Sequence, residues 1–192
     1  MLLTPTQTRH LFQHALEHKY AILAVNADSP AAIVDCLEAS RQCQSPIIIE
    51  TSLWQLNGHS FGVGDAFLGI KRYLTDLAVL TQSERYRHLP VVYHTDHIKG
   101  PQTLSLLQAA IQGLPLRLGE IDLHMVASSI SLDSSELSAD ENLATIAALC
   151  EAAQAAGVDA TLEMEAGVDD GVTSLDETRA LFGAAELANP GY

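Results

Sequence analysis

The segment VVYHTDHIKG, residues 91–100, joins an apolar run to side chains that could carry out chemistry. The run begins like a buried strand and ends with His94, Asp96 and His97 within four positions. Neutral imidazole and carboxylate oxygen are good ligands for Zn²⁺, and a carboxylic acid can also transfer a proton. We therefore interpret the end of this strand as part of a functional site.

Polar side chains also end the other apolar runs of the chain. They are Asn26, Ser52, Asp133, Glu163 and Glu165. A single Asn or Ser at a strand end is more often a turn residue, but Glu163 and Glu165 are two positions apart and face the same side of a strand. Burying two like charges is costly unless a cation or protons relieve them. Taken together, these strand ends favour one shared site.

A divalent metal would use such a set of imidazole and carboxylate groups, with an open position for substrate. Zn²⁺ bound to a ketone or aldehyde oxygen acts as a Lewis acid, which stabilises the enolate formed when a carbon–carbon bond breaks or an α proton leaves. A neighbouring carboxylic acid can deliver or take the proton. The side chains at the strand ends therefore suit aldol chemistry.

The elements that must position these residues alternate along the chain. Strands are expected at residues 21–27, 46–52, 90–97, 121–133 (with 128–133 the most strand-like part) and 160–167. Helices are expected at residues 6–18, 29–43, 64–80, 101–113, 138–157 and 174–187. The strands are apolar on both faces, which is typical of a buried parallel sheet. The pattern predicts an α/β fold of the TIM (β/α)8-barrel type, with about the first five βα units in a single domain over residues 1–192. The carboxyl ends of its strands would meet at one mouth.

Composition limits the classes of function. The 192 residues are 47% hydrophobic and 18% charged, and the formal net charge is −14 without a basic cluster, so nucleic acid is not an expected partner. No apolar run of about 18 residues exists and the first twenty residues lack the apolar core of a signal peptide, which predicts a cytoplasmic protein without a membrane span. A small anionic substrate remains compatible with this acidity, because local backbone N–H groups can bind a phosphate.

Three separated motifs resemble those of the class II, metal-dependent ketose-bisphosphate aldolase family. They are LPVVYHTDH, then SSISLDSSELSADENLATI, then ATLEMEAG, and the resemblance covers essentially the whole chain. Members of that family cleave fructose or tagatose 1,6-bisphosphate. The resemblance therefore implies a TIM barrel, a Zn²⁺ cofactor and a small phosphorylated sugar as substrate.

The resemblance also implies roles for individual residues. Asp96 would be the catalytic proton donor, and His97 and Glu165 would bind the zinc ion. Glu163 would support Glu165, and Asp133 would lie beside the metal or at an alternate metal position. Weaker matches place Asn26 and Ser52 among the residues that contact substrate.

The sequence also departs from the family pattern. Family members supply two more zinc histidines and a phosphate-binding loop from beyond the fifth strand, whereas this sequence ends at Tyr192. A homo-oligomer, or completion by another chain segment, is therefore expected. Two alternatives stay open at this point: an accessory, catalytically incompetent aldolase-like subunit, and a metal-dependent sugar epimerase with the same enolate chemistry.

Overall fold

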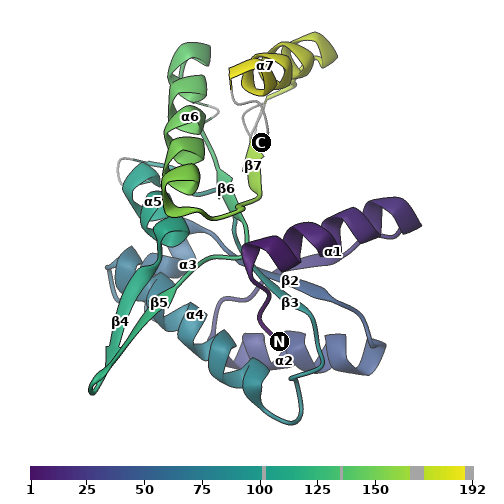
Figure 1. The fold of residues 1–192 in the computed structure, drawn as a ribbon, viewed down its shortest axis with the longest axis vertical. Helices are drawn as coiled ribbons and strands as arrows, with labels where there is room; N and C mark the ends of the chain where they lie inside the picture. Colours follow the sequence, from purple (N-terminus) through teal and green to yellow (C-terminus); the bar gives the residue numbers. More distant parts are fainter. Residues whose placement is uncertain (101–102, 135, 165–170, 189–192) are drawn as a thin grey trace.

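A computed structural model describes residues 1–100, 103–134, 136–164 and 171–188 of the chain (Figure 1). Its elements follow one another in this order: α1 (Pro5–His18), β1 (Leu23–Asn26), α2 (Pro30–Cys43), β2 (Ile47–Thr51), α3 (Leu53–Asn57), α4 (Ala66–Gln82), β3 (Val91–Thr95), α5 (Thr103–Gln112), β4 (Leu114–Leu118), β5 (Ile121–Met125), β6 (Ile130–Leu132), α6 (Ala139–Ala156), β7 (Leu162–Met164) and α7 (Leu175–Ala188). In the described part of the chain, no helix has the length and apolar character needed to cross a membrane.

Strands β1, β2 and β3 form a parallel sheet in that order. Each crossover contains at least one helix, as a parallel connection requires. Helix α2 begins where Ser29 accepts a hydrogen bond from the Ala32 N–H and Pro30 occupies the first turn, and α4 begins where the Asp65 carboxylate caps two N–H groups. Local capping residues thus fix where the helices start, and these starts agree with the sequence prediction to within two residues.

The sheet has two different faces. The helix face carries Ile47, Ile49 and Tyr93, which share a buried apolar cluster with side chains of α2 and α4. The opposite face, called the site face below, carries polar residues near the strand ends and lies toward α1. Figure 1 shows α1 and the pair α2 and α4 on opposite sides of β2 and β3. Phe12 of α1 lines a small cavity together with Ile48 of the site face.

The parallel arrangement continues beyond β3. Strands β6 and β7 pair in parallel, and isolated bridges from His94 to Ser129 and from Ile98 to Leu132 join β3 to β6. The order of parallel strands is therefore β1, β2, β3, β6, β7. This confirms the predicted α/β class with parallel strands, while closure into a (β/α)8 barrel stays a prediction.

One segment differs from the expected fourth strand, residues 121–133. Its second half forms β6 as predicted, but its first half, β5, pairs in an antiparallel hairpin with β4. The pairs Leu116 with Leu123 and Leu118 with Ile121 lie on one face, and Gly119, with a φ of 64°, occupies the two-residue turn. The apolar residues in this stretch alternate with polar ones, which is the pattern of a hairpin rather than of a buried parallel strand.

Candidate active site

Three polar side chains form a row across the site face. The strand register places Asn26 opposite Glu50 and Glu50 opposite His94. Side chains that are paired in this way project from the same face of a sheet. The row lies at the last or next-to-last residue of each strand. It therefore forms the floor beneath the loops that follow the carboxyl ends of the strands.

Asn26 connects two carboxylates that belong to neighbouring strands. Its Nδ2 donates to Oδ2 of Asp96 at 2.8 Å and to Oε1 of Glu50 at 3.1 Å. An amide NH₂ group has two donors, so it can serve both oxygens at once. Asn26 therefore fixes the position of Asp96, and it holds two acidic groups near each other.

The backbone bends sharply where Asp96 and His97 leave β3. The Asp96 N–H donates to the Thr51 carbonyl at 2.8 Å, His97 adopts a left-handed conformation with a φ of 44°, and Ile98 then returns to pair with Leu132. A left-handed conformation is uncommon for a residue other than glycine, and such residues concentrate at functional sites. The bend turns the His97 ring back toward the preceding carboxylate, with His97 Nε2 3.4 Å from Asp96 Oδ1.

His94 is buried and contacts two other elements. Its Nδ1 lies 2.8 Å from the Ser129 hydroxyl, and its Nε2 lies 2.9 Å from Oε2 of Glu163. The hydrogen-bonding interaction with His94 lowers the pKa of the Glu163 carboxyl below its ordinary value, against an opposing effect of burial. His94 thus links β3 to β7 and favours the charged form of Glu163.

Glu50 has the opposite electrostatic environment. Burial raises the pKa of its carboxyl, and the negative charge of Asp96 raises it further. The pKa values of Glu50, on β2, and of Glu163, on β7, are therefore shifted in opposite directions. A pair of acids separated in this way is a feature of sites that transfer protons.

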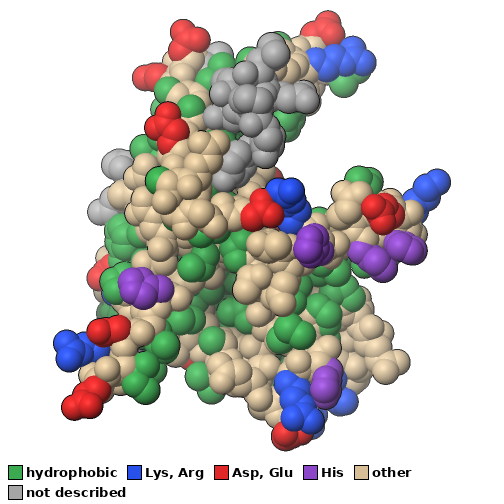
Figure 2. Space-filling model, viewed as in Figure 1, with side chains coloured by type: hydrophobic (Ala, Val, Ile, Leu, Met, Phe, Trp, Pro, Cys, Tyr) green, Lys and Arg blue, Asp and Glu red, His purple; other side chains and the backbone are tan. Residues whose placement is uncertain are grey.

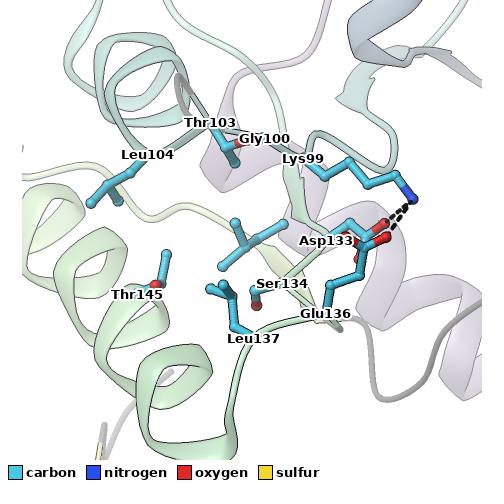
Figure 3. A pocket seen from close by; sticks show the side chains of 10 residues that line it. Lys99, Gly100, Thr103, Leu104, Asp133, Ser134, Glu136, Leu137 and Thr145 are labelled. Atoms are coloured by element: carbon cyan, nitrogen blue, oxygen red, sulfur yellow. Dashed lines mark ion pairs between the residues drawn. The ribbon is translucent and has the colours of Figure 1, made fainter.

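Asp133 lies at the end of β6, beside a separate cavity of about 560 Å³ between α5 and α6. Its side chain is 2% exposed, and its Oδ2 lies 3.4 Å from Nζ of Lys99. Figure 3 shows the Lys99 ammonium directed at Asp133 and at Glu136, which is 3.8 Å away. The ammonium group neutralises the buried carboxylate at the rim of this cavity.

Ser52 is buried at the N-terminus of α3, where its N–H and hydroxyl both donate to Oε1 of Gln55 at 2.7 Å and 3.3 Å. It therefore stabilises the start of the loop that follows β2. Its predicted contact with substrate stays a prediction.

The donors at the strand ends have the right chemistry for zinc, since imidazole and carboxylate are its usual ligands together with thiolate. Among the residues that the structure describes, however, no three His, Cys, Asp or Glu side chains converge as a metal site. Glu165, the predicted ligand on the fifth parallel strand, lies outside the described residues. Zinc binding by these residues therefore stays a prediction.

The structure groups the predicted residues in three places. Asp96 contacts both Asn26 and His97. Glu163, on β7, contacts His94, and Asp133 is engaged by Lys99. Sequence reasoning missed Glu50. A charged residue at the end of an otherwise apolar strand, two positions before Ser52, was the signal that could have revealed it.

The sequence model of one protein family, described as Fructose-bisphosphate aldolase class-II, matches residues 6–188. The fructose-bisphosphate aldolase of Saccharomyces cerevisiae is 30% identical over 168 residues, covering 84% of this chain and 45% of the yeast protein. That of Candida albicans is 33% identical over 204 residues, covering 96% of this chain and 52% of its own length. The chain spans about half the length of the curated relatives it matches.

Solved structures show the same fold. The crystal structure of a fructose-bisphosphate aldolase from Campylobacter jejuni superposes with a TM-score of 0.72 at 23% identity, covering 98% of this chain and 56% of that one. A crystal structure from Coccidioides immitis, described as that of a putative fructose-1,6-biphosphate aldolase, superposes with a TM-score of 0.63 at 20% identity, covering 91% of this chain and 55% of that one. The arrangement of helices and parallel strands is therefore shared with known aldolases.

Proposed function

Because this chain belongs to the class II fructose-bisphosphate aldolase family, we propose that it provides the first part of the active site of a zinc-dependent aldolase. The reaction is the reversible aldol cleavage of a phosphorylated ketose of the fructose or tagatose 1,6-bisphosphate type. The observation that carries the proposal is the contact of Asn26 with Asp96, beside His97, at the carboxyl ends of β1 and β3. Active sites of parallel α/β barrels are built at those ends.

Zinc binding is assigned to His97 and Glu165, with Glu163 and Asp133 nearby. His97 supplies an imidazole next to the proton-transferring acid, and Glu165 follows Glu163 by two positions in the sequence, the spacing expected for one side of a strand. A zinc ion held by these residues would supply Lewis-acid polarisation of the ketose carbonyl. The contact of Glu163 with His94 and that of Asp133 with Lys99 support positioning roles for both carboxylates.

Asp96 moves the proton in the proposed reaction. The Asn26 amide holds its Oδ2, so the rotation of the carboxyl is restricted and the group presents a defined oxygen at the mouth. Proton transfer from a positioned acid contributes about 10²–10⁴-fold to a rate. Ser52, at the start of the loop after β2, and Asn26 are the proposed contacts with the substrate.

The rest of the proposed site comes from outside residues 1–192. The relatives are about twice as long, and strand β1 is an edge strand on which Leu23 is 67% exposed. An exposed apolar edge strand requires a partner or a cover. We assign the missing ligands and phosphate contacts to a further chain segment or to a second copy of this chain.

The proposal is tested on the native protein, purified from its own cells together with any chain that accompanies it. Cleavage of fructose 1,6-bisphosphate and of tagatose 1,6-bisphosphate is measured before chelation, after chelation and after zinc is restored. We expect activity that disappears with the chelator and returns with zinc. Activity that survives removal of all bound metal, or the absence of cleavage by folded, zinc-loaded protein, would contradict the proposal.

A further inference from the structure

Three histidines of α1 repeat at every fourth residue and have no role in the proposed aldolase site. His10, His14 and His18 therefore lie on one side of the helix, all exposed. Figure 2 shows histidine side chains gathered along the outer part of α1. Two imidazoles on one helix can chelate a transition-metal ion whose remaining positions are filled by water.

Only His14 and His18 are already in contact. Their ring centroids are 4.0 Å apart and the ring planes differ by 18°. Zinc–nitrogen and similar bonds are about 2.0–2.1 Å long, so two nitrogens on one ion are at most about 4 Å apart. An imidazole binds a metal ion in the plane of its ring, so the two rings must turn out of the stacked arrangement to bind a common ion, and the exposure of both side chains leaves room for that rotation.

Hydrogen bonding prepares His18 to act as a ligand. Its Nδ1 lies 2.9 Å from the carbonyl oxygen of His14. A carbonyl can only accept, so Nδ1 carries the proton and the lone pair of the neutral ring is on Nε2. This is the arrangement found around most metal-binding histidines, in which the second ring nitrogen donates to a carbonyl or carboxylate.

Tyr20 provides the corresponding contact for His14. Its hydroxyl lies 2.9 Å from His14 Nδ1 and can accept a hydrogen bond from the Nδ1–H group, which again leaves the Nε2 lone pair for a metal. Lys19, in the left-handed conformation with a φ of 55°, ends α1 and folds the chain back so that Tyr20 reaches the helix. The Nε2 atoms of His14 and His18 have no hydrogen bond or ion pair within the described residues.

From this geometry we propose that His14 and His18 form a surface binding site for a divalent transition-metal ion, held by the two Nε2 atoms and independent of the strand-end site. Imidazole ligands suit copper, nickel and zinc, and the stability order of divalent ions places Cu²⁺ first. The overall negative charge of the chain adds a general attraction for cations.

The test is a titration of chelator-treated protein with Cu²⁺, followed by calorimetry and by electron paramagnetic resonance for nitrogen coordination. His14→Gln and His18→Gln should each weaken one equivalent of Cu²⁺ binding by about tenfold or more. The matched control His10→Gln removes a histidine from the same side of the same helix, one turn earlier, and should leave that equivalent unchanged. Circular dichroism of the metal-free variants checks that the exposed helix is intact.

A fourth variant separates this site from the proposed active site. His97→Ala should leave the equivalent assigned to α1 unchanged, whatever it does to zinc at the strand ends. The proposal is overturned if His14→Gln and His18→Gln bind Cu²⁺ like the wild type, if His10→Gln loses as much affinity as they do, or if His97→Ala removes the same equivalent.

Discussion

The two faces of the β1, β2 and β3 sheet contain consecutive residues of the same strands, yet they differ in almost every physical property. On the helix face, Ile49 and Tyr93 are fully buried and pack with α2 and α4. On the site face, one residue further along, Glu50 and His94 join Asn26 in a polar network. The alternation of side chains along each strand thus separates those that stabilise the fold from those assigned to chemistry. Substitutions at two adjacent positions of one strand should therefore have different kinds of effect on the protein.

The largest expected effect tests the helix face. Ile49→Ala removes a fully buried side chain and should lower the free energy of unfolding by about 2–5 kcal/mol. The matched control Ile48→Ala changes the same side chain on the site face, where it is only partly buried, and should cost clearly less. Urea denaturation of both variants measures the difference. Equal losses of unfolding free energy would show that the two faces of the sheet contribute equally to stability.

A smaller effect of opposite sign is expected from Glu50→Gln. The folded protein binds the Glu50 proton more tightly than the unfolded chain, because burial and Asp96 raise the pKa of this carboxyl above 4.5. The wild type therefore loses stability as the pH rises from about 4.5 through the raised pKa. Glutamine removes that cost, so the variant should melt at a higher temperature at pH 7 and equal the wild type near pH 4.

The control for Glu50→Gln is Glu151→Gln, which removes one negative charge from an exposed position of α6. It reports how much the melting temperature gains from reducing the net charge of −14 alone. Melting curves of metal-free protein across this pH range make the comparison. An equal increase in melting temperature at pH 7 for both variants would show that Glu50 affects stability only through the net charge.

The smallest effect is expected from Glu163→Gln. The interaction with His94 lowers the pKa of Glu163, so its contribution to stability is present above about pH 4.5 and is lost as the pH falls through the lowered pKa. The Glu163 side chain is 55% exposed, and such ion pairs contribute at most about 1 kcal/mol. The variant should be slightly less stable than the wild type at pH 7 and equal to it in acid, which is the reverse of Glu50→Gln.

The sequence predicted what depends on local chemistry and on strand order. Capping residues and apolar runs located the longer helices and the five parallel strands but not the short helix α3, and the motif ending in Asp96 and His97 located a strand end. Glu50 was missed because its importance comes from register: it matters only once β1 and β3 lie on either side of it. The ion pair of Asp133 with Lys99 was equally invisible, since a tertiary contact brings together residues 34 positions apart.

The hairpin of β4 and β5 was missed for a different reason. Residues 121–125 were included in the expected fourth strand, whereas the alternation of apolar and polar residues on both sides of Gly119 favours an exposed antiparallel pair. The error did not affect the site, because β6 still begins after the hairpin and places Ser129 against His94. The two-residue alternation of apolar and polar side chains, together with the turn residue, was more informative in this segment than overall hydrophobicity.

The rate of ketose-bisphosphate cleavage by Asp96→Asn, measured in the native zinc-loaded protein, tests the central claim most directly. Asparagine keeps the size of the side chain and an oxygen that can accept the Asn26 hydrogen bond, but it cannot deliver a proton. We predict a fall in kcat of about 10²–10⁴-fold with unchanged folding and zinc content. The exposed control Asp122→Asn, on the hairpin, should keep full activity. A kcat for Asp96→Asn within about twofold of the wild type would contradict the assignment of the site face to aldol chemistry.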